Sequence, residues 1–292
     1  MPHTHTQDPI DNGGAAAKAR ALPDIKQVAA RRAMRSDFGP SLPAAPRSEF
    51  AAFDRPEAPD WLITEDYYEV DHGPIKSGKE ATVNLVERRS PNGSCLLARK
   101  VYKSESERSF RRDQIYREGR KIRSSRTRRA IELGTQTGRN AMRSEWRHTE
   151  YLYLVKLWEA GVTVPYPVAF EGGLLMQYLG NEERSAPRLY EIKPTRDQAA
   201  ALGDQILLEI RKMAGEGVVH GDLSAYNILV WEGAAWIIDL PQAVELGHNA
   251  HAPELLRRDI QNVARFLERR GLAVDLEEEF ASCMSALYTT GP

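Results

Sequence analysis

The segment His220-Gly-Asp-Leu-Ser-Ala-Tyr-Asn227, followed by Ile237-Ile-Asp239, is the stretch that decides the fold. It holds an aspartate, an asparagine five residues later and a second aspartate at the end of a predicted hairpin strand. Such oxygen-bearing side chains around one point can orient an attacking hydroxyl and supply two hard ligands to Mg²⁺ in phosphoryl transfer. The alternative is a turn in which Asp and Asn bond only to nearby backbone. The second aspartate favours the first interpretation, with Asp222 as catalytic carboxylate and Asn227 and Asp239 as magnesium ligands.

A lysine lies on a predicted strand in the first half of the chain. Lys100 belongs to Ala98–Tyr102 and shares a face with both ends of that segment. By itself it would be a solvated edge residue. Beside the loop above, it is the candidate to hold the α- and β-phosphates of ATP, paired with a glutamate on a helix. Glu150, near the start of the next predicted helix, is the best partner, and Glu145 and Glu159 are weaker alternatives.

The segment Gly73-Pro-Ile-Lys-Ser-Gly-Lys-Glu80 nearly matches the P-loop pattern G-x-x-x-x-G-K-[ST] but fails at its last position. Glu80 has no hydroxyl to ligate Mg²⁺, and the following residues alternate as a strand where a P-loop requires a helix. We therefore predict a tight turn between two strands that lies over the nucleotide phosphates. Ser77 and the backbone amides are its candidate contacts.

The first half of the chain is rich in strand signals. Alternation from Ile75 and a turn at Pro91-Asn-Gly93 predict a hairpin. A helix spans the segment from Trp146 to Trp158 and ends at Gly161, because apolar residues recur there at helical spacing. The runs Val162–Val168 and Leu174–Tyr178 indicate two more short strands.

The second half is rich in helix signals. Thr195 with Gln198 three residues later predicts a capping box at the start of a long helix. Short hairpin strands are expected at Asn227–Trp231 and Ala235–Leu240, and a helix from about Pro253. These patterns predict an α+β fold of two lobes with a cleft, residues 61–178 forming the first lobe and 179–292 the second. Residues 1–60 cannot bury enough apolar surface to fold and are expected to be a disordered tail.

Composition excludes several classes of protein. The chain has 292 residues, 41% hydrophobic and 28% charged, as in ordinary globular proteins. Its two cysteines, Cys95 and Cys283, show no CxxC spacing, which argues against a disulfide framework or a zinc knuckle and favours a reducing compartment. Neither a run of about 18 apolar residues nor a signal-peptide pattern is present, so the expectation is a cytoplasmic protein without a membrane segment.

Charge is uneven along the chain. The net charge is −1, yet residues 103–147 hold fourteen Lys and Arg against six Asp and Glu. A basic segment of this kind attracts phosphates, so RNA or an acidic protein is a candidate partner. A solvated loop and helix is the equally weighted alternative.

Three motifs resemble those of the RIO-type atypical serine/threonine protein kinases. Ile75-Lys-Ser-Gly-Lys-Glu-Ala-Thr-Val83 is similar to their phosphate loop, I-S-T-G-K-E-A-x-V, and residues 220–227 to their catalytic loop, H-x-D-L-S-x-Y-N. Ile237-Ile-Asp-Leu-Pro-Gln-Ala-Val244 is similar to their metal loop, in which D-x-P-Q replaces DFG. The resemblance is collinear from about Ile75 to Leu267. Two departures are Thr149, where a lysine is usual, and Gln177, where the family usually has Glu.

This resemblance implies a trimmed protein-kinase-like fold without an activation segment, because Ala252-Pro-Glu254 follows Asp239 too closely to close one. It implies serine autophosphorylation, ATPase turnover and, in archaea and eukaryotes, a role in small-subunit ribosome maturation. Adenine would bind hinge backbone, with Met176 as gatekeeper, and the metal would be Mg²⁺ or Mn²⁺. The residues expected to bind ATP are Ser77, Gly78, Lys79, Glu80, Val83, Lys100, Met176, Gln177, Leu179, Ser224 and Tyr226.

Two other functions stay open from the sequence. A small-molecule kinase of the aminoglycoside or choline type also uses H-G-D-x-x-x-x-N followed by a strand aspartate. A binding module switched by nucleotide, without turnover, is the third hypothesis. Ser224, Tyr226 and the pair Pro241-Gln242 favour a protein kinase acting on itself or on a protein partner, since small-molecule kinases usually differ there.

Overall fold

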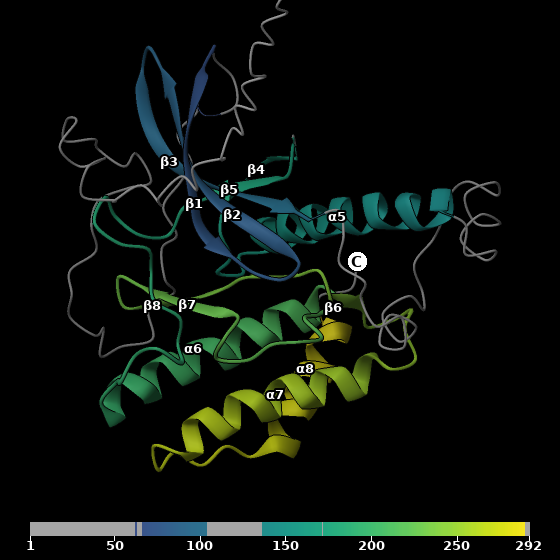
Figure 1. Ribbon diagram of the computed structural model, residues 1–292. Coiled ribbons are helices and arrows are strands. Elements are labelled where there is room, and N and C mark those ends of the chain that lie inside the picture. The colour runs from purple at the N-terminus through teal and green to yellow at the C-terminus, as the bar shows by residue number, and fades with distance from the viewer. Residues whose placement is uncertain (1–61, 63–65, 104–135, 171, 290–292) are drawn as a thin grey trace, which may run out of the picture.

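The computed structural model describes residues 62, 66–103, 136–170 and 172–289, except the side chains of residues 136–147 and 289. It is an α+β structure with an antiparallel sheet in one half and helices in the other (Figure 1). The elements are β1 (Tyr68–Ser77), β2 (Ala81–Ser90), β3 (Gly93–Tyr102), α5 (Gln136–Glu159), β4 (Pro167–Phe170), β5 (Leu174–Gln177), α6 (Arg196–Gly215), β6 (Val218–Val219), β7 (Ile228–Trp231), β8 (Ala234–Ile237), β9 (Val244–Glu245), α7 (Ala252–Glu268) and α8 (Leu276–Thr289).

The sheet has the strand order β1-β2-β3-β5-β4, with antiparallel pairing throughout. Val83 on β2 pairs with Lys100 on β3, and Ala98 on β3 pairs with Met176 on β5. Residues directly opposite each other share a face of a sheet. One face therefore carries Lys100 beside a small apolar cluster, whose buried members are Leu85, Ala98 and Tyr178 and whose half-buried members are Ile75, Val83, Leu96 and Met176.

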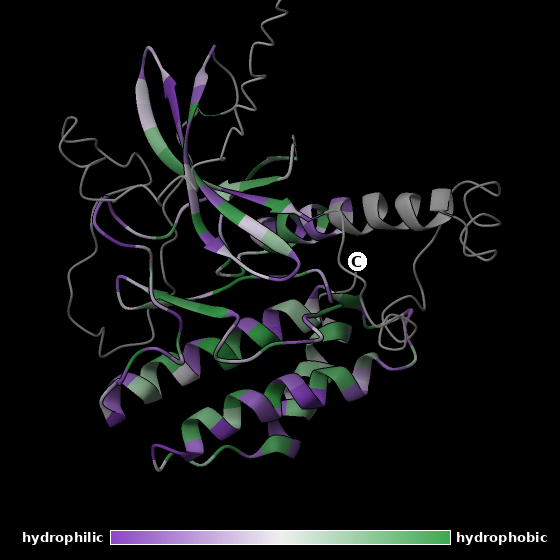
Figure 2. Ribbon diagram, viewed as in Figure 1, coloured by the Kyte–Doolittle hydropathy of each residue, from purple (hydrophilic) through white to green (hydrophobic). Residues whose placement is uncertain are grey.

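The main core belongs to the helical half. Apolar and polar bands alternate along α6 and α7 (Figure 2), as expected for helices that bury one face. The last turns of α5 contribute Tyr153, Leu154 and Leu157 to this same core. Helix α5 therefore lies beside the sheet and packs its last turns into the helical half. The side chain of Glu150, one turn before Tyr153, lies between the sheet and the helical half.

The predicted strand over Val162–Val168 is wrong in its first five residues. β4 begins at Pro167, and residues 162–166 form a buried loop whose backbone bonds reach other elements. Thr163 donates its amide and its hydroxyl to the Glu209 carboxylate, at 2.8 and 3.0 Å, and its carbonyl accepts from Ile237. The run is apolar because it is buried, not because it pairs in a sheet.

The capping box at α6 is confirmed. The Thr195 hydroxyl accepts from the Gln198 amide, and the Gln198 side chain accepts from the Thr195 amide. The hairpin turn at residues 91–93, the strand at Leu174 and helices α6 and α7 are confirmed. The helix predicted over Trp146–Trp158 begins ten residues earlier, at Gln136. The described part of the chain contains no helix long and apolar enough to cross a membrane.

Replacing the cap residue should lower stability without touching the active site. Thr195→Ala leaves one helix amide without its acceptor and is expected to lower the free energy of unfolding by about 1 kcal/mol. Chemical denaturation measures this change. Lys193→Ala, at an exposed position just before the helix, is the matched control and should be neutral; equal loss in both variants would contradict the cap.

Candidate active site

The catalytic-loop candidate follows β6 and is shaped by its glycine. Gly221 has a φ of +81°, a conformation that costs a glycine little and other residues more. The Asp222 amide donates to Nδ1 of His220 at 3.3 Å. The Asp222 carboxylate is exposed, and no hydrogen bond to it is found from the described residues. Asp222 therefore presents a charged group that is available to a ligand.

Helix α7 holds this loop by its backbone. The buried Asp259 carboxylate accepts from the amides of Gly221, at 2.8 Å, and Leu223, at 2.9 Å. The Arg258 guanidinium donates to the Gly221 carbonyl, and the Asn262 amide donates to the Leu223 carbonyl at 2.9 Å. The residues on both sides of Asp222 are thus fixed by one helix.

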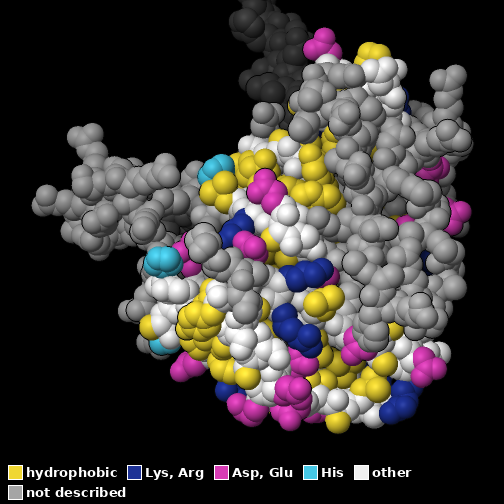
Figure 3. Space-filling model, turned by 180° about the vertical axis from the view of Figure 1, so that it is seen from behind, with side chains coloured by type: hydrophobic (Ala, Val, Ile, Leu, Met, Phe, Trp, Pro, Cys, Tyr) yellow, Lys and Arg dark blue, Asp and Glu magenta, His cyan; other side chains and the backbone are white. Residues whose placement is uncertain are grey.

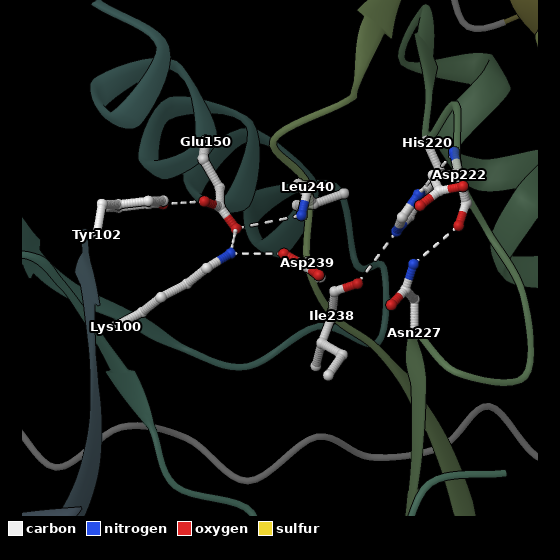
Figure 4. A network of polar contacts seen from close by, with 9 residues as sticks. All are labelled: Lys100, Tyr102, Glu150, His220, Asp222, Asn227, Ile238, Asp239 and Leu240. Atoms are coloured by element: carbon white, nitrogen blue, oxygen red, sulfur yellow. Dashed lines mark hydrogen bonds and ion pairs between the residues drawn. The ribbon is translucent and has the colours of Figure 1, made fainter. Parts of the chain in front are cut away.

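The three predicted oxygen-bearing residues come together through the loop backbone (Figure 4). The Asn227 side-chain amide donates to the Asp222 carbonyl at 2.8 Å, which leaves the Asn227 side-chain oxygen for another partner. The Ile238 amide donates to the Asn227 carbonyl at 3.0 Å, and Nε2 of His220 donates to the Ile238 carbonyl at 3.1 Å. Asp239 follows directly. These hydrogen bonds link the two segments whose spacing in the sequence suggested a common site.

Asp239 lies in the left-handed region, with a φ of +72°, where a residue other than glycine is strained by about 1 kcal/mol. Its carboxylate forms an ion pair with Lys100 at 2.6 Å. Burial acts to raise the pKa of Asp239, but the charge and hydrogen bond of Lys100 outweigh it and lower the pKa below its usual value. Asp239 is therefore an anion at neutral pH.

Lys100 forms a buried pair with Glu150, the glutamate favoured from the sequence, at 2.7 Å between Nζ and Oε1. Burial alone would lower the pKa of Lys100, but the charges of Glu150 and Asp239 raise it, so the side chain is an ammonium. Oε1 of Glu150 also accepts from the Leu240 amide at 3.2 Å. Oε2 accepts from the Tyr102 hydroxyl, whose pKa is raised by burial and by Glu150.

The predicted phosphate loop is a turn between two strands, as expected. Gly78 donates to the Ala81 carbonyl at 2.9 Å, and residues 77–80 are exposed. Nζ of Lys103 donates to the Ser77 hydroxyl at 3.0 Å and to the Gly78 carbonyl at 2.7 Å. Lys79 and Glu80 therefore lie on a turn whose position is set partly by a lysine from the neighbouring strand.

The predicted adenine contacts lie at the end of β5. The Gln177 amide donates to the Tyr166 carbonyl at 2.8 Å, and the Leu179 carbonyl accepts from Ala186 at 2.9 Å. Among the loop and turn hydrogen bonds of the described residues, none is donated by the Leu179 backbone amide. The Gln177 side chain accepts from the Tyr166 amide at 3.2 Å. A glutamate could accept the same bond, so the departure at Gln177 leaves the backbone geometry unchanged.

Ser224 and Tyr226 lie on the outer side of the loop. The Ser224 hydroxyl accepts weakly from the Tyr226 amide at 3.4 Å. The exposed Tyr226 ring stacks on Tyr190 with 4.3 Å between centroids. Among the described residues, the contacts of these two side chains do not include Lys100 or Asp239, so their expected roles toward ATP stay predictions.

Several supporting residues escaped the sequence reasoning. The sequence places Tyr102 at the end of a strand, on the face of Lys100, but assigns no role to it or to Lys103. In the structure they contact Glu150 and the phosphate turn. Asp259 is noticeable as a charged residue on the otherwise apolar, buried stripe of α7, next to the exposed Arg258. The burial of Asp259, at 1% exposure, identifies it as an anchor.

The donor set suits a hard cation. An amide oxygen from Asn227 and a carboxylate from Asp239 are ligands that Mg²⁺ accepts, with phosphate oxygens and water completing its shell. Among the described residues no group of three or more His, Cys, Asp or Glu side chains could hold a metal without such help. The site therefore fits an ion that arrives with a nucleotide.

The expected nucleic-acid partner depends on residues 103–147, most of which lie outside the described side chains. On the rear face, the Lys and Arg side chains of the described residues lie singly among acidic and apolar ones (Figure 3). That face shows no continuous basic patch among the residues drawn in colour. The role of the basic segment stays a prediction.

Known proteins resemble this chain over most of the described structure. The family model described as RIO domain matches residues 86–280, from β2 into α8. The RIO-type serine/threonine-protein kinase Rio1 of Haloferax volcanii is 34% identical over 216 residues, 73% of this chain and 69% of that protein. Rio1 of Thermoplasma acidophilum is 36% identical over 138 residues, 47% of this chain and 71% of that protein. Human serine/threonine-protein kinase RIO1 is 32% identical over 215 residues, 73% of this chain and 36% of its own length.

The anchor Asp259 predicts a pH dependence of stability. Burial raises the pKa of Asp259 from 3.8 to about 6, so between these values the folded chain keeps a proton that the unfolded chain releases. The free energy of unfolding contributed by Asp259 should fall as pH rises from about 4 to about 6, by up to about 3 kcal/mol. Above about pH 6 both states are ionised and the contribution stays at its lower value.

Denaturation of wild type and Asp259→Asn at pH 4, 5, 6 and 7 measures this difference, because the variant has no group to titrate at that position. Wild type should lose stability relative to the variant across this range. Asn262→Ala removes another contact to the same loop without a titrating group, and its difference from wild type should be independent of pH. A constant difference for Asp259→Asn would refute the assignment.

Proposed function

The chain belongs to the RIO family of serine/threonine-protein kinases, and from this membership we propose that it transfers the γ-phosphate of Mg·ATP to serine or threonine. The observation that carries the proposal is the meeting of Asp222, Asn227 and Asp239 opposite the Lys100–Glu150 pair. Proton acceptor, metal ligands and phosphate-binding cation are then all supplied by one cleft.

We assign the chain the two-lobed kinase architecture, with the sheet and α5 as the first lobe and residues 179–292 as the second. Adenine would lie against the apolar cluster that contains Val83, Ala98 and Met176. The Gln177 carbonyl and the Leu179 amide would bond to its edge. Such an apolar slot with a few backbone donors and acceptors is the usual form of a nucleotide site.

The phosphates would be bound mainly by charge. Lys100 is a cation held between two carboxylates, and in kinases this lysine contacts the α- and β-phosphates. Asn227 and Asp239 would hold Mg²⁺, which neutralises charge on the β- and γ-phosphates. The low pKa of Asp239 keeps this ligand ionised without a proton to displace. Ser77 and the backbone amides of the turn between β1 and β2 would contact phosphate oxygens.

Asp222 would act on the acceptor. Its carboxylate is exposed, while α7 fixes the amides of Gly221 and Leu223 on either side. A fixed loop that presents a free carboxylate can orient a hydroxyl and accept its proton as the phosphoryl group moves. The same arrangement accommodates a serine of another protein, a serine of this chain, or water, which corresponds to kinase, autophosphorylation and ATPase activity.

Control by an activation segment is not part of the proposal. Only residues 240–251 separate Asp239 from α7, and within them β9 returns to pair with β6. Gly221 occupies the position where protein kinases carry the arginine that binds an activation-loop phosphate. Both backbone groups of Gly221 already bond to α7. The site geometry would therefore be complete without loop phosphorylation.

A small-molecule kinase would use the same catalytic loop and remains the alternative. The relatives are named serine/threonine-protein kinases, which favours a protein acceptor. An involvement with ribosomal or RNA partners, and a cytoplasmic location, remain expectations from the sequence.

Removing the proposed proton acceptor should slow phosphate transfer severely. Asp222→Asn is expected to lower kcat by roughly 10²–10⁴ with Mg²⁺ and labelled ATP, because a positioned acceptor contributes about that factor. Incorporation into protein and release of phosphate are measured together. Asp204→Asn, at an exposed position on α6, is the control and should keep wild-type activity. Full activity of Asp222→Asn would remove the assignment.

Removing the proposed metal ligand should already affect the binding of ATP with Mg²⁺, which precedes phosphate transfer. Asp239→Asn is expected to abolish turnover and to weaken the dependence of ATP binding on Mg²⁺, because one hard anionic ligand is lost. Nucleotide titrations with and without Mg²⁺ test this separately from turnover. If Mg²⁺ strengthens ATP binding equally in wild type and variant, Asp239 does not hold the metal.

A further inference from the structure

Both carboxylate oxygens of Glu150 are bonded, and one bond comes from a residue outside the proposed catalytic set. Oε1 accepts from Lys100 and from the Leu240 amide, whereas Oε2 accepts from the Tyr102 hydroxyl. We propose that Tyr102 is a positioning residue that holds the Glu150 carboxylate in the orientation in which it pairs with Lys100. The inference rests on the proposed function, since it concerns the same phosphate-binding pair.

The placement of Tyr102 follows from the strand. Successive side chains of a strand alternate between its faces, so Tyr102 and Lys100, two residues apart on β3, point the same way. Figure 4 shows Tyr102 and Lys100 reaching Glu150 from this strand, on either oxygen of its carboxylate. The ring of Tyr102 also lies 5.3 Å from Nζ of Lys100, within reach of a cation–π interaction. Tyr102 therefore limits the positions of both partners.

Burial makes this bond consequential. Glu150 is 2% exposed, so water cannot replace a donor that is lost from Oε2. A buried carboxylate oxygen without a partner is costly, and the side chain would be driven to turn toward another donor. Such a turn would remove Oε1 from Lys100 and Leu240, because the two oxygens of a carboxylate move together.

Lys100 alone does not hold Glu150 in this orientation. Its ammonium is shared with Asp239, at 2.6 Å, and both Lys100 and Asp239 belong to the groups proposed to bind phosphate and metal. Contacts that are independent of these ligands must then fix Glu150. Among the described residues, the Tyr102 hydroxyl and the Leu240 amide provide such contacts.

This role also suits a chain with so short a connection after Asp239. In protein kinases the position of the helix glutamate is controlled by the helix and the activation loop. Here the hydroxyl that holds the glutamate comes from the same strand as the lysine, so the pair is set by the folded sheet. The hydrogen bond from Tyr102 would keep Lys100 and Glu150 paired whether or not a nucleotide is bound.

The test is a double-mutant cycle on Mg·ATP affinity and kcat, using the full chain. Tyr102→Phe should weaken Mg·ATP binding and lower kcat, each by about tenfold, the effect expected from a hydrogen bond to a charged group. In the Glu150→Gln background, Tyr102→Phe should change Mg·ATP affinity and kcat by less than about twofold each, because Tyr102 acts through Glu150. Because a partly unfolded variant would show a weaker apparent affinity, each variant is measured under conditions in which denaturation shows it to be fully folded.

Tyr151→Phe is the matched control, because it removes a hydroxyl from the half-buried residue next to Glu150 on α5 and should bind Mg·ATP as wild type does. Two results would overturn the positioning role while wild type still binds Mg·ATP: Tyr102→Phe equal to wild type, or losses that multiply in the double variant. Failure of wild type itself to bind Mg·ATP would overturn the proposed function, and the positioning role with it.

Discussion

The buried ion pair between Lys100 and Glu150 is the interaction on which the site depends. It joins β3 to α5, and α5 is packed by its last turns into the core of the helical half. The Leu240 amide adds the segment that follows Asp239. A single carboxylate thus sets the distance between the sheet, the helix and the metal-binding candidate.

Such a pair adds little to stability, because removing two charges from water costs about as much as their attraction returns. Its value lies in geometry. Lys100 stays a cation inside the protein mainly because two carboxylates face it, and the pKa of Asp239 is lowered mainly by Lys100. Each charge makes the other possible, and together they define where a phosphate and a hard cation can lie.

Helix α7 supports the loop that carries Asp222 in a similar way. Asp259 accepts two loop amides, and Arg258 and Asn262 donate to two loop carbonyls. The loop can then be irregular, with a left-handed Gly221, and still hold Asp222 in place. Charged and polar contacts therefore fix both the Lys100–Glu150 pair and the loop that carries Asp222.

The sequence by itself singled out the residues that are proposed to act on the ligand. Asp222, Asn227 and Asp239 stand out because oxygen ligands at this spacing have few structural uses, and Glu150 was favoured because a strand lysine needs a helix partner. Most elements followed from local periodicity. The exceptions include the first ten residues of α5, which precede the apolar repeat, and Val162–Val168, where burial produced the same apolar pattern as a strand.

Only the tertiary structure decided what holds those residues. Tyr102, Lys103 and Asp259 act through contacts with parts of the chain 25 to 48 residues away, as for Lys103 with Gly78, Asp259 with Leu223 and Tyr102 with Glu150. Hydrogen bonds of this kind leave no periodic trace in the sequence, because they depend on how strands and helices meet. Candidate residues could therefore be proposed from residue types, whereas the contacts that support them required the fold.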